Sequence, residues 1–427
     1  MDYAGADRRH LWHPFTQQRT WTASEPLVVE SAEGNWLVDT EGRRYLDGVA
    51  SLWCNVHGHR HPHIDAAIRA QLDRVAHSTL LGLANTTAVA AATALVDVVP
   101  DGLTRVFFSE NGAAAVEVAL KMAFRYWHNR GDTNRRTFLA LDEAYHGDTL
   151  GAVSAGGIDL FHAAFAPLLF ECFRAPTNSP RRSLDELLDP MDATLAEHAH
   201  EICAVVIEPR CQGAAGMITF PAGYVRGVRD LCDRHGVLMI CDEVATGFGR
   251  TGTMFACEAE GVTPDLMAVG KGITGGYLPM SATLTTEAVY ESFLGEPEEG
   301  RQLFHGHTYS GNALAAAACI ANLEVFREED TLANAARAAD RMAARLEEIA
   351  QLERVADVRR AGTMVGIELD DRAGNAGAVA VCARVRDLGV VLRPLGPVVV
   401  WMPPLSIESG EVELLADATA TAIAELV

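Results

Sequence analysis

The chain of 427 residues is long enough for one large domain with its own core and a second, smaller domain. Hydrophobic residues make up 49% of it and charged residues 22%, which is a globular composition and excludes a largely disordered protein. The net charge of -22 arises without a dominant acidic run and disfavours binding to nucleic acid, whose phosphates carry the same sign.

The cysteines and the N-terminal residues bear on the compartment. Nine cysteines are scattered singly, without a CxxC pair, which favours reduced thiols in a cytoplasm over a disulfide or zinc framework. The segment Met1 to His10 contains no apolar signal core, and no later stretch is apolar for long enough to span a bilayer. The sequence therefore predicts a cytoplasmic protein without a membrane partner.

Short apolar runs of the length of buried strands recur through the first part of the chain. They are Thr104 to Phe108, Phe138 to Leu141, Cys203 to Ile207, Val237 to Cys241 and Leu266 to Val269. Longer stretches, including His63 to Val75 and Ala113 to Trp127, have the pattern of helices. This alternation predicts an α/β domain with a mainly parallel sheet.

The alternation stops around Arg301 to Asn312. Beyond it we expect helices at Ala313 to Phe326, Leu332 to Ala350 and Glu411 to Leu426, and strands at Gly362 to Leu369, Val390 to Arg393 and Val398 to Met402. Thr177 to Pro190 and Gly295 to Gly300 have the composition of loops. We therefore expect an N-terminal segment 1–60, a large domain 61–312, and connecting helices with a small α/β domain in 313–427.

The histidines between His57 and His63 raise the possibility of a metal site. Alternating histidines on a strand would share one face. Gly58 and Pro62 spoil that geometry, and Pro62 suits the first position of the helix that follows. His305 and His307 also lack further ligands at useful spacing, so the sequence predicts no metal site.

A glycine pattern at Gly247, Gly249 and Gly252 matches GxGxxG, follows a predicted strand and has Asp265 downstream. A dinucleotide-binding turn requires a helix that opens on these glycines. The residues after Gly252 have no clear apolar face and run into Pro264, so a nicotinamide site is disfavoured.

Two charged residues follow buried strands, where an open α/β sheet places its ligands. Asp242 comes after Val237 to Cys241, and Lys271 stands between two glycines after Leu266 to Val269. Pyridoxal phosphate requires an amine for its aldehyde and a carboxylate for its ring nitrogen. A surface lysine and a capping aspartate would have the same spacing, so the pair alone leaves both interpretations open.

A third strand end offers a place for an anion. Ser109 to Ala113 follows the strand Thr104 to Phe108 and opens the helix Ala113 to Trp127. Backbone N–H groups and the helix dipole at such a turn point toward a phosphate. A helix that is simply well capped would give the same pattern.

The segments Asp242 to Gly252 and Gly270 to Gly276 together resemble the signature of the class III (omega-amino) pyridoxal-phosphate aminotransferases, and the likeness covers nearly the whole chain. It implies a fold-type I transferase with a large domain and a smaller α/β domain built from the chain termini. Further segments resemble the branch that serves biotin biosynthesis: His10 to Pro14, Asn55 to His59, Tyr145 to Thr149, His305 to Thr308 and Leu392 to Pro394. That branch converts 8-amino-7-oxononanoate to 7,8-diaminononanoate, with lysine or S-adenosylmethionine as amino donor.

The resemblance also implies roles for individual residues. Lys271 would be catalytic and bond to pyridoxal phosphate, Asp242 would pair with the ring nitrogen, and Tyr145 would face the ring and the substrate. The other implied roles are cofactor binding by Gly112, Ala113, His307 and Thr308, and substrate binding by Trp53, Gly306, Phe15 and Arg393. Thr308 would come from the partner subunit, because this family builds its active sites across a homodimer interface.

Two departures from the family pattern refine this interpretation. The segment Glu208 to Gly213 is one residue longer than the usual Glu-Pro-x-Gln-Gly and continues into Ala214 and Ala215, without the glutamate that neutralises the arginine in many relatives. Arg393 would then stay free for a substrate carboxylate. Phe15 and Leu52 stand where relatives that use S-adenosylmethionine carry a tyrosine and a tryptophan, which favours lysine as the donor.

Other functions share parts of this pattern. Another class III enzyme, such as an omega-amino acid or diamine aminotransferase, a racemase, an aminomutase or a decarboxylase, would use the same cofactor. A non-catalytic binding protein is disfavoured because both Asp242 and Lys271 are present.

Overall fold

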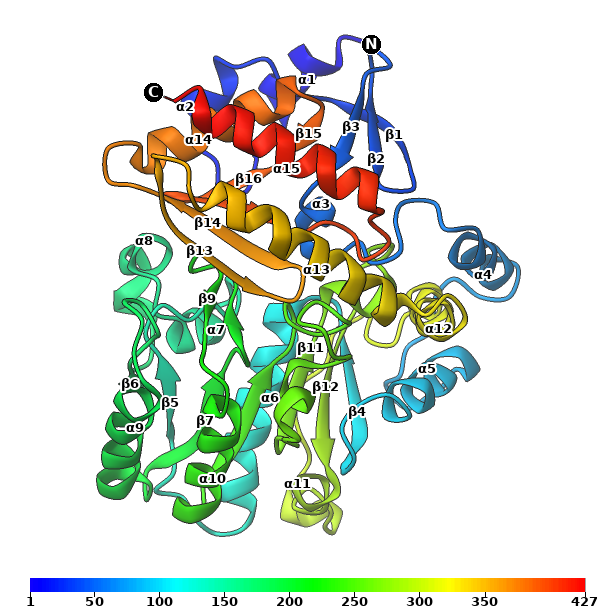
Figure 1. Ribbon diagram of the computed structural model, residues 1–427. Helices are drawn as coiled ribbons and strands as arrows, with labels where there is room; N and C mark the ends of the chain where they lie inside the picture. The colour runs from blue at the N-terminus through cyan, green and yellow to red at the C-terminus, as the bar shows by residue number, and fades with distance from the viewer. Residues whose placement is uncertain (427) are drawn as a thin grey trace.

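A seven-stranded sheet forms the centre of the larger part of the molecule in the computed structural model, which describes residues 1–426 (Figure 1). Its strands, in spatial order, are β4 (Leu103–Ser109), β12 (Ser281–Thr286), β11 (Leu266–Val269), β10 (Leu238–Asp242), β7 (Ile202–Ile207), β5 (Thr137–Leu141) and β6 (Phe173–Ala175). Strands β11, β10, β7, β5 and β6 are parallel, and only β12 runs against its neighbours. The predicted α/β class with a mainly parallel sheet is confirmed.

The five strands expected in this region all form, with ends that differ by one residue at most. In β7, β10 and β11 every residue is buried, as expected for strands covered on both faces. Helix α6 (Gly112–Asn129) packs on one face. The other face is covered by α5 (Thr86–Val96), α9 (Leu184–His198), α10 (Tyr224–His235) and α12 (Ala313–Glu328).

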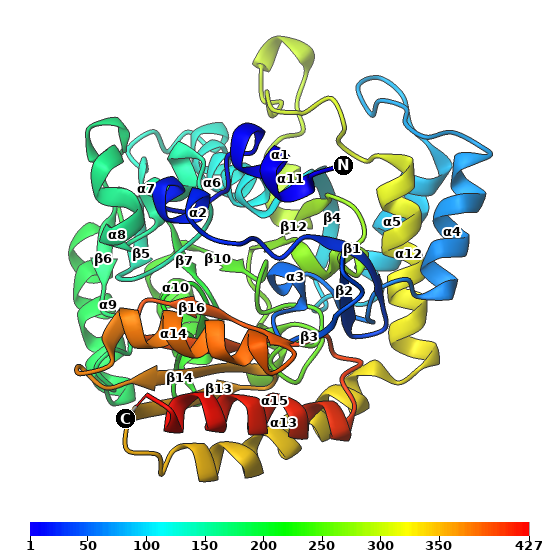
Figure 2. The same cartoon turned by 90° about the horizontal axis from the view of Figure 1, so that it is seen from above.

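A second part of the molecule contains two four-stranded sheets, together with the N-terminal strands and the last described helix of the chain (Figures 1 and 2). One sheet joins β1 (Val29–Glu33), β2 (Trp36–Asp39) and β3 (Arg44–Asp47) to β15 (Val390–Val391). The other contains β13 (Val355–Ala361), β14 (Met364–Leu369), β17 (Val398–Trp401) and β16 (Arg393–Leu395). Three helices pack into the same core: α13 (Thr331–Ile349), α14 (Gly374–Asp387) and α15 (Ser409–Ala424).

The structure corrects two expectations in this second part. The single strand expected at Val390 to Arg393 is two strands in different sheets, because the chain leaves β15 at Leu392 and enters β16 at Arg393. The strand expected from Gly362 begins at Met364, and Gly362 forms the turn after the unexpected strand β13. A Cβ on Gly362 would lie 2.3 Å from the carbonyl oxygen of Arg250, so this turn requires glycine.

The prediction of a loop over Thr177 to Pro190 was also wrong at its C-terminal end, because α9 begins at Leu184. Ser183 caps this helix, and Glu186 completes a capping box with it. Pro190 lies inside the helix. In the loop expected over Gly295 to Gly300, a short 3-10 turn spans Pro297–Glu299.

The remaining elements are short. They are α1 (Tyr3–His10), α2 (Gln18–Thr22), α3 (Ala50–Trp53), α4 (Pro62–Leu72), α7 (Leu150–Ala155), α8 (Asp159–His162), α11 (Glu287–Glu291), β8 (Cys211–Gln212), β9 (Ile218–Thr219), and the 3-10 turns η1 (Ala163–Leu168), η2 (Ala256–Glu260), η3 (Lys271–Thr274) and η4 (Pro297–Glu299). In residues 1–426 no helix is long and apolar enough to cross a membrane.

The histidine run and the glycine pattern, for which a ligand-binding role was disfavoured, have ordinary structural roles. Pro62 is the first residue of α4, as predicted. The histidines beside it contact separate partners, for example His59 with Asp47 and His61 with Glu329, and the described residues contain no group of three or more side chains placed to bind a metal. After Gly252 the chain forms the 3-10 turn η2, which is not the helix that a dinucleotide site requires.

Candidate active site

Asp242 is the last residue of β10 and lies at the carboxyl edge of the large sheet. Its side chain is only 5% exposed. One carboxylate oxygen accepts the Val244 N–H at 3.0 Å, and the other lies 2.7 Å from Nδ1 of His146. The carboxylate is therefore held in one orientation by two partners.

Lys271 follows the neighbouring strand β11 after one glycine. Its backbone has a φ of 45°, a left-handed conformation that turns the chain sharply. Burial lowers the pKa of its amine, and the charges of Asp242 and Glu208 act in the opposite direction. The amine lies 4.8 Å from the centre of the Trp53 ring.

Glu208 follows β7, the next strand in the sheet, and is 4% exposed. It accepts the backbone N–H groups of Tyr145 at 3.1 Å and Gly213 at 3.0 Å. Burial raises its pKa to about 7, and the charge of Asp242 also raises it, while His146 lowers it. The sheet edge thus presents two buried carboxyl groups near one amine.

The N-terminus of α6 forms a third wall. Asn111 caps it by accepting the Ala114 N–H at 2.9 Å, which leaves the N–H groups of Gly112 and Ala113 at the end of an 18-residue helix. A Cβ on Gly112 would lie 2.5 Å from Val244, and one on Gly147 would lie 2.3 Å from the Cβ of Ala113. These close approaches bring backbone rather than side chains to the cavity, as an anion site requires.

These walls enclose a cavity of about 420 Å³. Among the residues that line it, the sequence singled out Trp53, Gly112, Ala113, Tyr145, Asp242 and Lys271. Sequence reasoning missed His146 and Glu208 as site residues. Glu208 could have been found, because it follows a predicted strand at the same sheet edge, whereas His146 is recognised only by its contact with Asp242.

Trp53 reaches the cavity from a strained turn. Ala50, Ser51 and Trp53 all have positive φ values, which are rare outside glycine. The fully buried Asp47 holds this turn: its carboxylate accepts the Ser51 N–H at 2.8 Å and lies 3.0 Å from Nε2 of His59. The other carboxylate oxygen accepts the Val49 N–H at 3.3 Å.

Five predicted site residues do not line this cavity in the single chain. Gly306, His307 and Thr308 are exposed in the segment before α12. Arg393 is half-buried in β16, and among the described residues its side chain has no hydrogen bond or ion pair. Phe15 is 55% exposed, and its ring centre lies 5.3 Å from that of Phe161, which in turn lies 6.2 Å from that of Tyr145.

Known proteins that are similar to this chain point to one family. A family model described as aminotransferase class-III matches residues 18–423. The chain is 52% identical to the adenosylmethionine-8-amino-7-oxononanoate aminotransferase of Nitratidesulfovibrio vulgaris, over 98% of this chain and 80% of that protein. It is 49% identical to the protein of the same name from Geobacter sulfurreducens, over 96% of this chain and 95% of that protein.

Two crystal structures extend the likeness to three dimensions. That of the adenosylmethionine-8-amino-7-oxononanoate aminotransferase from Methanocaldococcus jannaschii has a TM-score of 0.95 at 44% identity, over 99% of this chain and 98% of that one. An amine transaminase from an uncultivated Pseudomonas species, in its pyridoxal-phosphate-bound form, has a TM-score of 0.91 at 35% identity, over 97% and 98%.

Proposed function

Because the chain belongs to the class III aminotransferase family, whose cofactor is pyridoxal phosphate, we propose that it aminates 8-amino-7-oxononanoate to 7,8-diaminononanoate in biotin biosynthesis. The names of relatives that match nearly the whole chain support this substrate. The observation that carries the proposal is the cavity at the sheet edge that Lys271, Asp242 and Trp53 line together, with the Lys271 amine 4.8 Å from the centre of the Trp53 ring.

The residues of this cavity fit the cofactor. Lys271 would bond to its aldehyde carbon, Asp242 would pair with its ring nitrogen, and Tyr145 would lie against the ring face. The N–H groups of Gly112 and Ala113 would bind its phosphate. When bound, pyridoxal phosphate supplies an electron sink that stabilises a carbanion next to nitrogen.

The protein's own residues contribute proton transfer and a fixed position for the charged groups around the cofactor. Burial lowers the Lys271 pKa, which increases the share of neutral amine that is able to remove a proton from the donor carbon and return it. His146 keeps the Asp242 carboxylate directed into the cavity. Buried, backbone-bonded Glu208 fixes the position of the segment that carries Tyr145.

Arg393 would bind the distant carboxylate of the oxononanoate, with Trp53, Gly306 and Phe15 lining the substrate pocket. Two observations support this role. The Arg393 guanidinium has no partner of its own among residues 1–426, and Ala214 lines the cavity near where many relatives carry a neutralising glutamate. A bidentate contact there would hold the ketone in place for reaction.

A homodimer would complete the site. Gly306, His307 and Thr308 are exposed in this chain, which supports the proposal that they contribute to the active site of a partner subunit. Exposed apolar side chains at Leu81, Leu83 and Phe304 suit such an interface.

We further propose a cytoplasmic location and three structural parts, 1–60, 61–312 and 313–427. The nine unpaired cysteines, seven of them buried, support a reducing compartment. The sharing of one sheet by β3 and β15 supports an N-terminal segment that joins the C-terminal part.

Two compounds are candidates for the amino donor. The relatives' names support S-adenosylmethionine, whereas Phe15 and Leu52 support lysine. The experiment for the function is to incubate the cofactor-loaded enzyme with 8-amino-7-oxononanoate and each donor, and to identify the product by mass. Formation of 7,8-diaminononanoate with either donor supports the proposal, and its absence with both contradicts it.

A further inference from the structure

The segment Gly306 to Tyr309, before α12, is exposed to solvent, yet its backbone is anchored to the rest of the chain. The carbonyl oxygen of Thr308 lies 2.8 Å from Nε2 of His77. The ring of His77 also packs on that of Tyr309, with 4.9 Å between the ring centres. An exposed segment with an anchored backbone suits a contact outside its own chain.

The turn that follows this segment is anchored as well. Asn312 caps α12 and donates from Nδ2 to the carbonyl oxygen of Ala76 at 3.1 Å. Asn85 donates from Nδ2 to the carbonyl oxygen of Gly311 at 3.2 Å. Gly311 has a φ of 67°, and a Cβ on it would lie 2.4 Å from the side chain of Leu80. These contacts fix the C-terminal end of the segment.

Glu110 contacts the segment from another side. It directly precedes Asn111, the cap of α6, and its carboxylate pairs with Nδ1 of His307. A negative charge at this place is unfavourable for an anion site, because Gly112 and Ala113 in the same turn would bind a phosphate. Pairing with a protonated His307 ring offsets that repulsion. The pair joins the phosphate-binding turn to the exposed segment.

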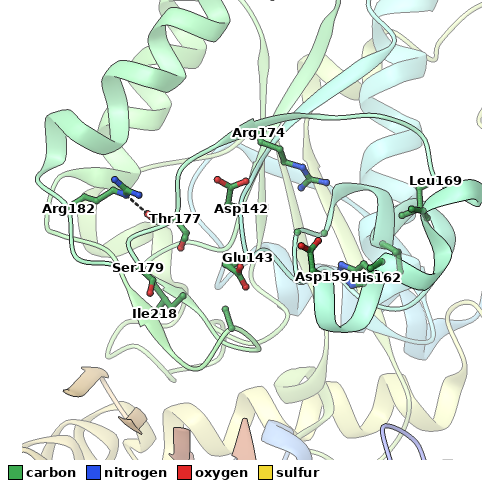
Figure 3. Close-up of a pocket in the computed structure, with 16 residues that line it drawn as sticks. Asp142, Glu143, Asp159, His162, Leu169, Arg174, Thr177, Ser179, Arg182 and Ile218 are labelled. Atoms are coloured by element: carbon green, nitrogen blue, oxygen red, sulfur yellow. Dashed lines mark hydrogen bonds between the residues drawn. The ribbon is translucent and has the colours of Figure 1, made fainter. Parts of the chain in front are cut away.

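Other acidic side chains near the active site lie in a different environment. Asp142, Glu143 and Asp159 line a neighbouring cavity of about 630 Å³ and are exposed (Figure 3). Water solvates such carboxylates, so they require no partner in the protein. The Glu110 side chain is only 22% exposed and has His307 as its partner. This difference points to a specific role for the pair.

The hydroxyl of Thr308 is left free by all these contacts. Within residues 1–426 it has no hydrogen-bond partner, although the carbonyl oxygen of the same residue has one. Thr308 does not line the active-site cavity of its own chain. The hydroxyl is therefore able to donate to an acceptor on another molecule, and a phosphate oxygen is such an acceptor.

We propose that Glu110 is a positioning residue for the active site of the partner subunit. Through His307 it holds the segment from which Thr308 donates to the phosphate bound in that subunit. This inference rests on the proposed function, because it requires the homodimer and its pyridoxal phosphate. It adds a physical link between the phosphate-binding turn of one subunit and the phosphate site of the other.

Hybrid dimers separate an effect across the interface from an effect within one subunit. Each hybrid is purified through two different tags and carries Lys271→Ala in one subunit, so only the other subunit is able to bond to the cofactor. The reference hybrid has no further change. The trans hybrid adds Glu110→Gln to the Lys271→Ala subunit, and the cis hybrid adds it to the subunit that retains Lys271.

The measurement requires no turnover. Each cofactor-free hybrid is equilibrated with a series of pyridoxal phosphate concentrations and reduced with borohydride. Mass spectrometry then gives the fraction of Lys271 peptide that carries the cofactor. The trans hybrid should require about tenfold more pyridoxal phosphate for half-labelling than the reference hybrid, because a hydrogen bond to a charged phosphate is weakened. The cis hybrid should bind at least as tightly as the reference, since it loses a negative charge near the phosphate.

Two further substitutions on the Lys271→Ala subunit test how Glu110 acts. His307→Gln should reproduce the effect of Glu110→Gln, and the two together should cost no more than either alone, because they break the same contact. The exposed control Glu171→Gln should match the reference hybrid.

Equal labelling of the trans and reference hybrids overturns the proposal, as does weaker binding in the cis hybrid alone. Both results leave the proposed function intact. A chain that light scattering shows to be monomeric also overturns the proposal, because no partner subunit is then present. Failure of the reference hybrid to label Lys271 contradicts the proposed function itself.

Discussion

The two sides of the candidate active site are built in different ways. On one side, Asp242, Glu208 and Lys271 stand at the ends of three adjacent strands, β10, β7 and β11. Pairing and complete burial of these strands fix the backbone that leads to each residue. On the other side, Phe15 and Arg393 come from a loop and a three-residue strand, and both are at least partly exposed.

This difference assigns the chemical steps to the sheet side of the site and the choice of substrate to the loop side. The sheet side is complete within one chain, so it suits the steps common to the whole family. In the proposed function the loop side gains its partners from the substrate and from a second subunit, so it suits the recognition of one substrate. Changes on the sheet side should therefore abolish all reactions, and changes on the loop side should alter which substrate reacts.

The largest effect is expected from Lys271→Ala on the sheet side. The chain has two lysines, Lys271 and the exposed Lys121, so the assignment is easily checked. Loss of the Lys271 amine should lower kcat/KM for every donor by on the order of 10^4 or more. Lys121→Ala is the matched control and should retain activity. After borohydride reduction of the parent, peptide mass spectrometry should find the cofactor on Lys271, and its recovery on Lys121 would sink the assignment.

Arg393→Ala tests the loop side and should have the next largest effect. Loss of a charge-assisted, bidentate contact should cost roughly 2 to 4 kcal/mol in transition-state binding of the oxononanoate. Cofactor absorbance should be unchanged, because Arg393 does not line the cofactor cavity. Single-turnover reaction of the loaded enzyme with the donor alone should persist. Unchanged kcat/KM for the oxononanoate would refute the role of Arg393.

The same division governs what the sequence could predict. The sheet side follows local rules, since apolar runs become buried strands and polar residues directly after them meet at one edge. Asp242, Lys271 and the N-terminus of α6 were found in this way. His146 was not, because its contact with Asp242 joins residues 96 positions apart, and no local pattern reports such a pairing.

The loop side depended on resemblance instead. No periodicity places Phe15 or Arg393 near a substrate. The error at Val390 to Arg393 shows why: the segment expected as one strand was divided by tertiary pairing, with Val390 and Val391 in one sheet and Arg393 at the start of a strand in another. The same holds for Trp53, whose position depends on buried Asp47 and a strained turn.

Glu208 provides a pH test of the sheet side. Burial raises its pKa from the usual value near 4.5 to about 7, so the folded protein holds a proton that the unfolded chain releases. The stabilising contribution of that proton is complete below about pH 4.5 and is lost as the pH rises to about 7. The loss is on the order of 3 kcal/mol, because one pKa unit corresponds to about 1.4 kcal/mol.

Glu208→Gln should remove this dependence, since an amide does not titrate. Urea unfolding of the cofactor-free parent and variant between pH 5 and pH 8 should give free energies of unfolding whose difference changes by that amount. Exposed Glu171→Gln is the control and should follow the parent at each pH. Parallel pH profiles for the parent and Glu208→Gln would mean that Glu208 ionises normally in the fold.

The smallest effect is expected from the paired change Phe15→Tyr and Leu52→Trp, which probes donor choice on the loop side. Phe15 connects to Tyr145 through Phe161, and Leu52 is 48% exposed next to Trp53. S-adenosylmethionine carries a sulfonium charge and an adenine ring, so a hydroxyl and a second aromatic face should favour it by about 0.5 to 1 kcal/mol. Lysine is slimmer and gains nothing from either group.

The measurement mixes each donor alone with the cofactor-loaded enzyme and follows the loss of cofactor absorbance. The parent should react with lysine, and the double variant should react with S-adenosylmethionine two- to fivefold faster than the parent, by roughly the same free energy. A parent that reacts rapidly with S-adenosylmethionine and not at all with lysine would contradict the lysine hypothesis, and the double change should then have little effect.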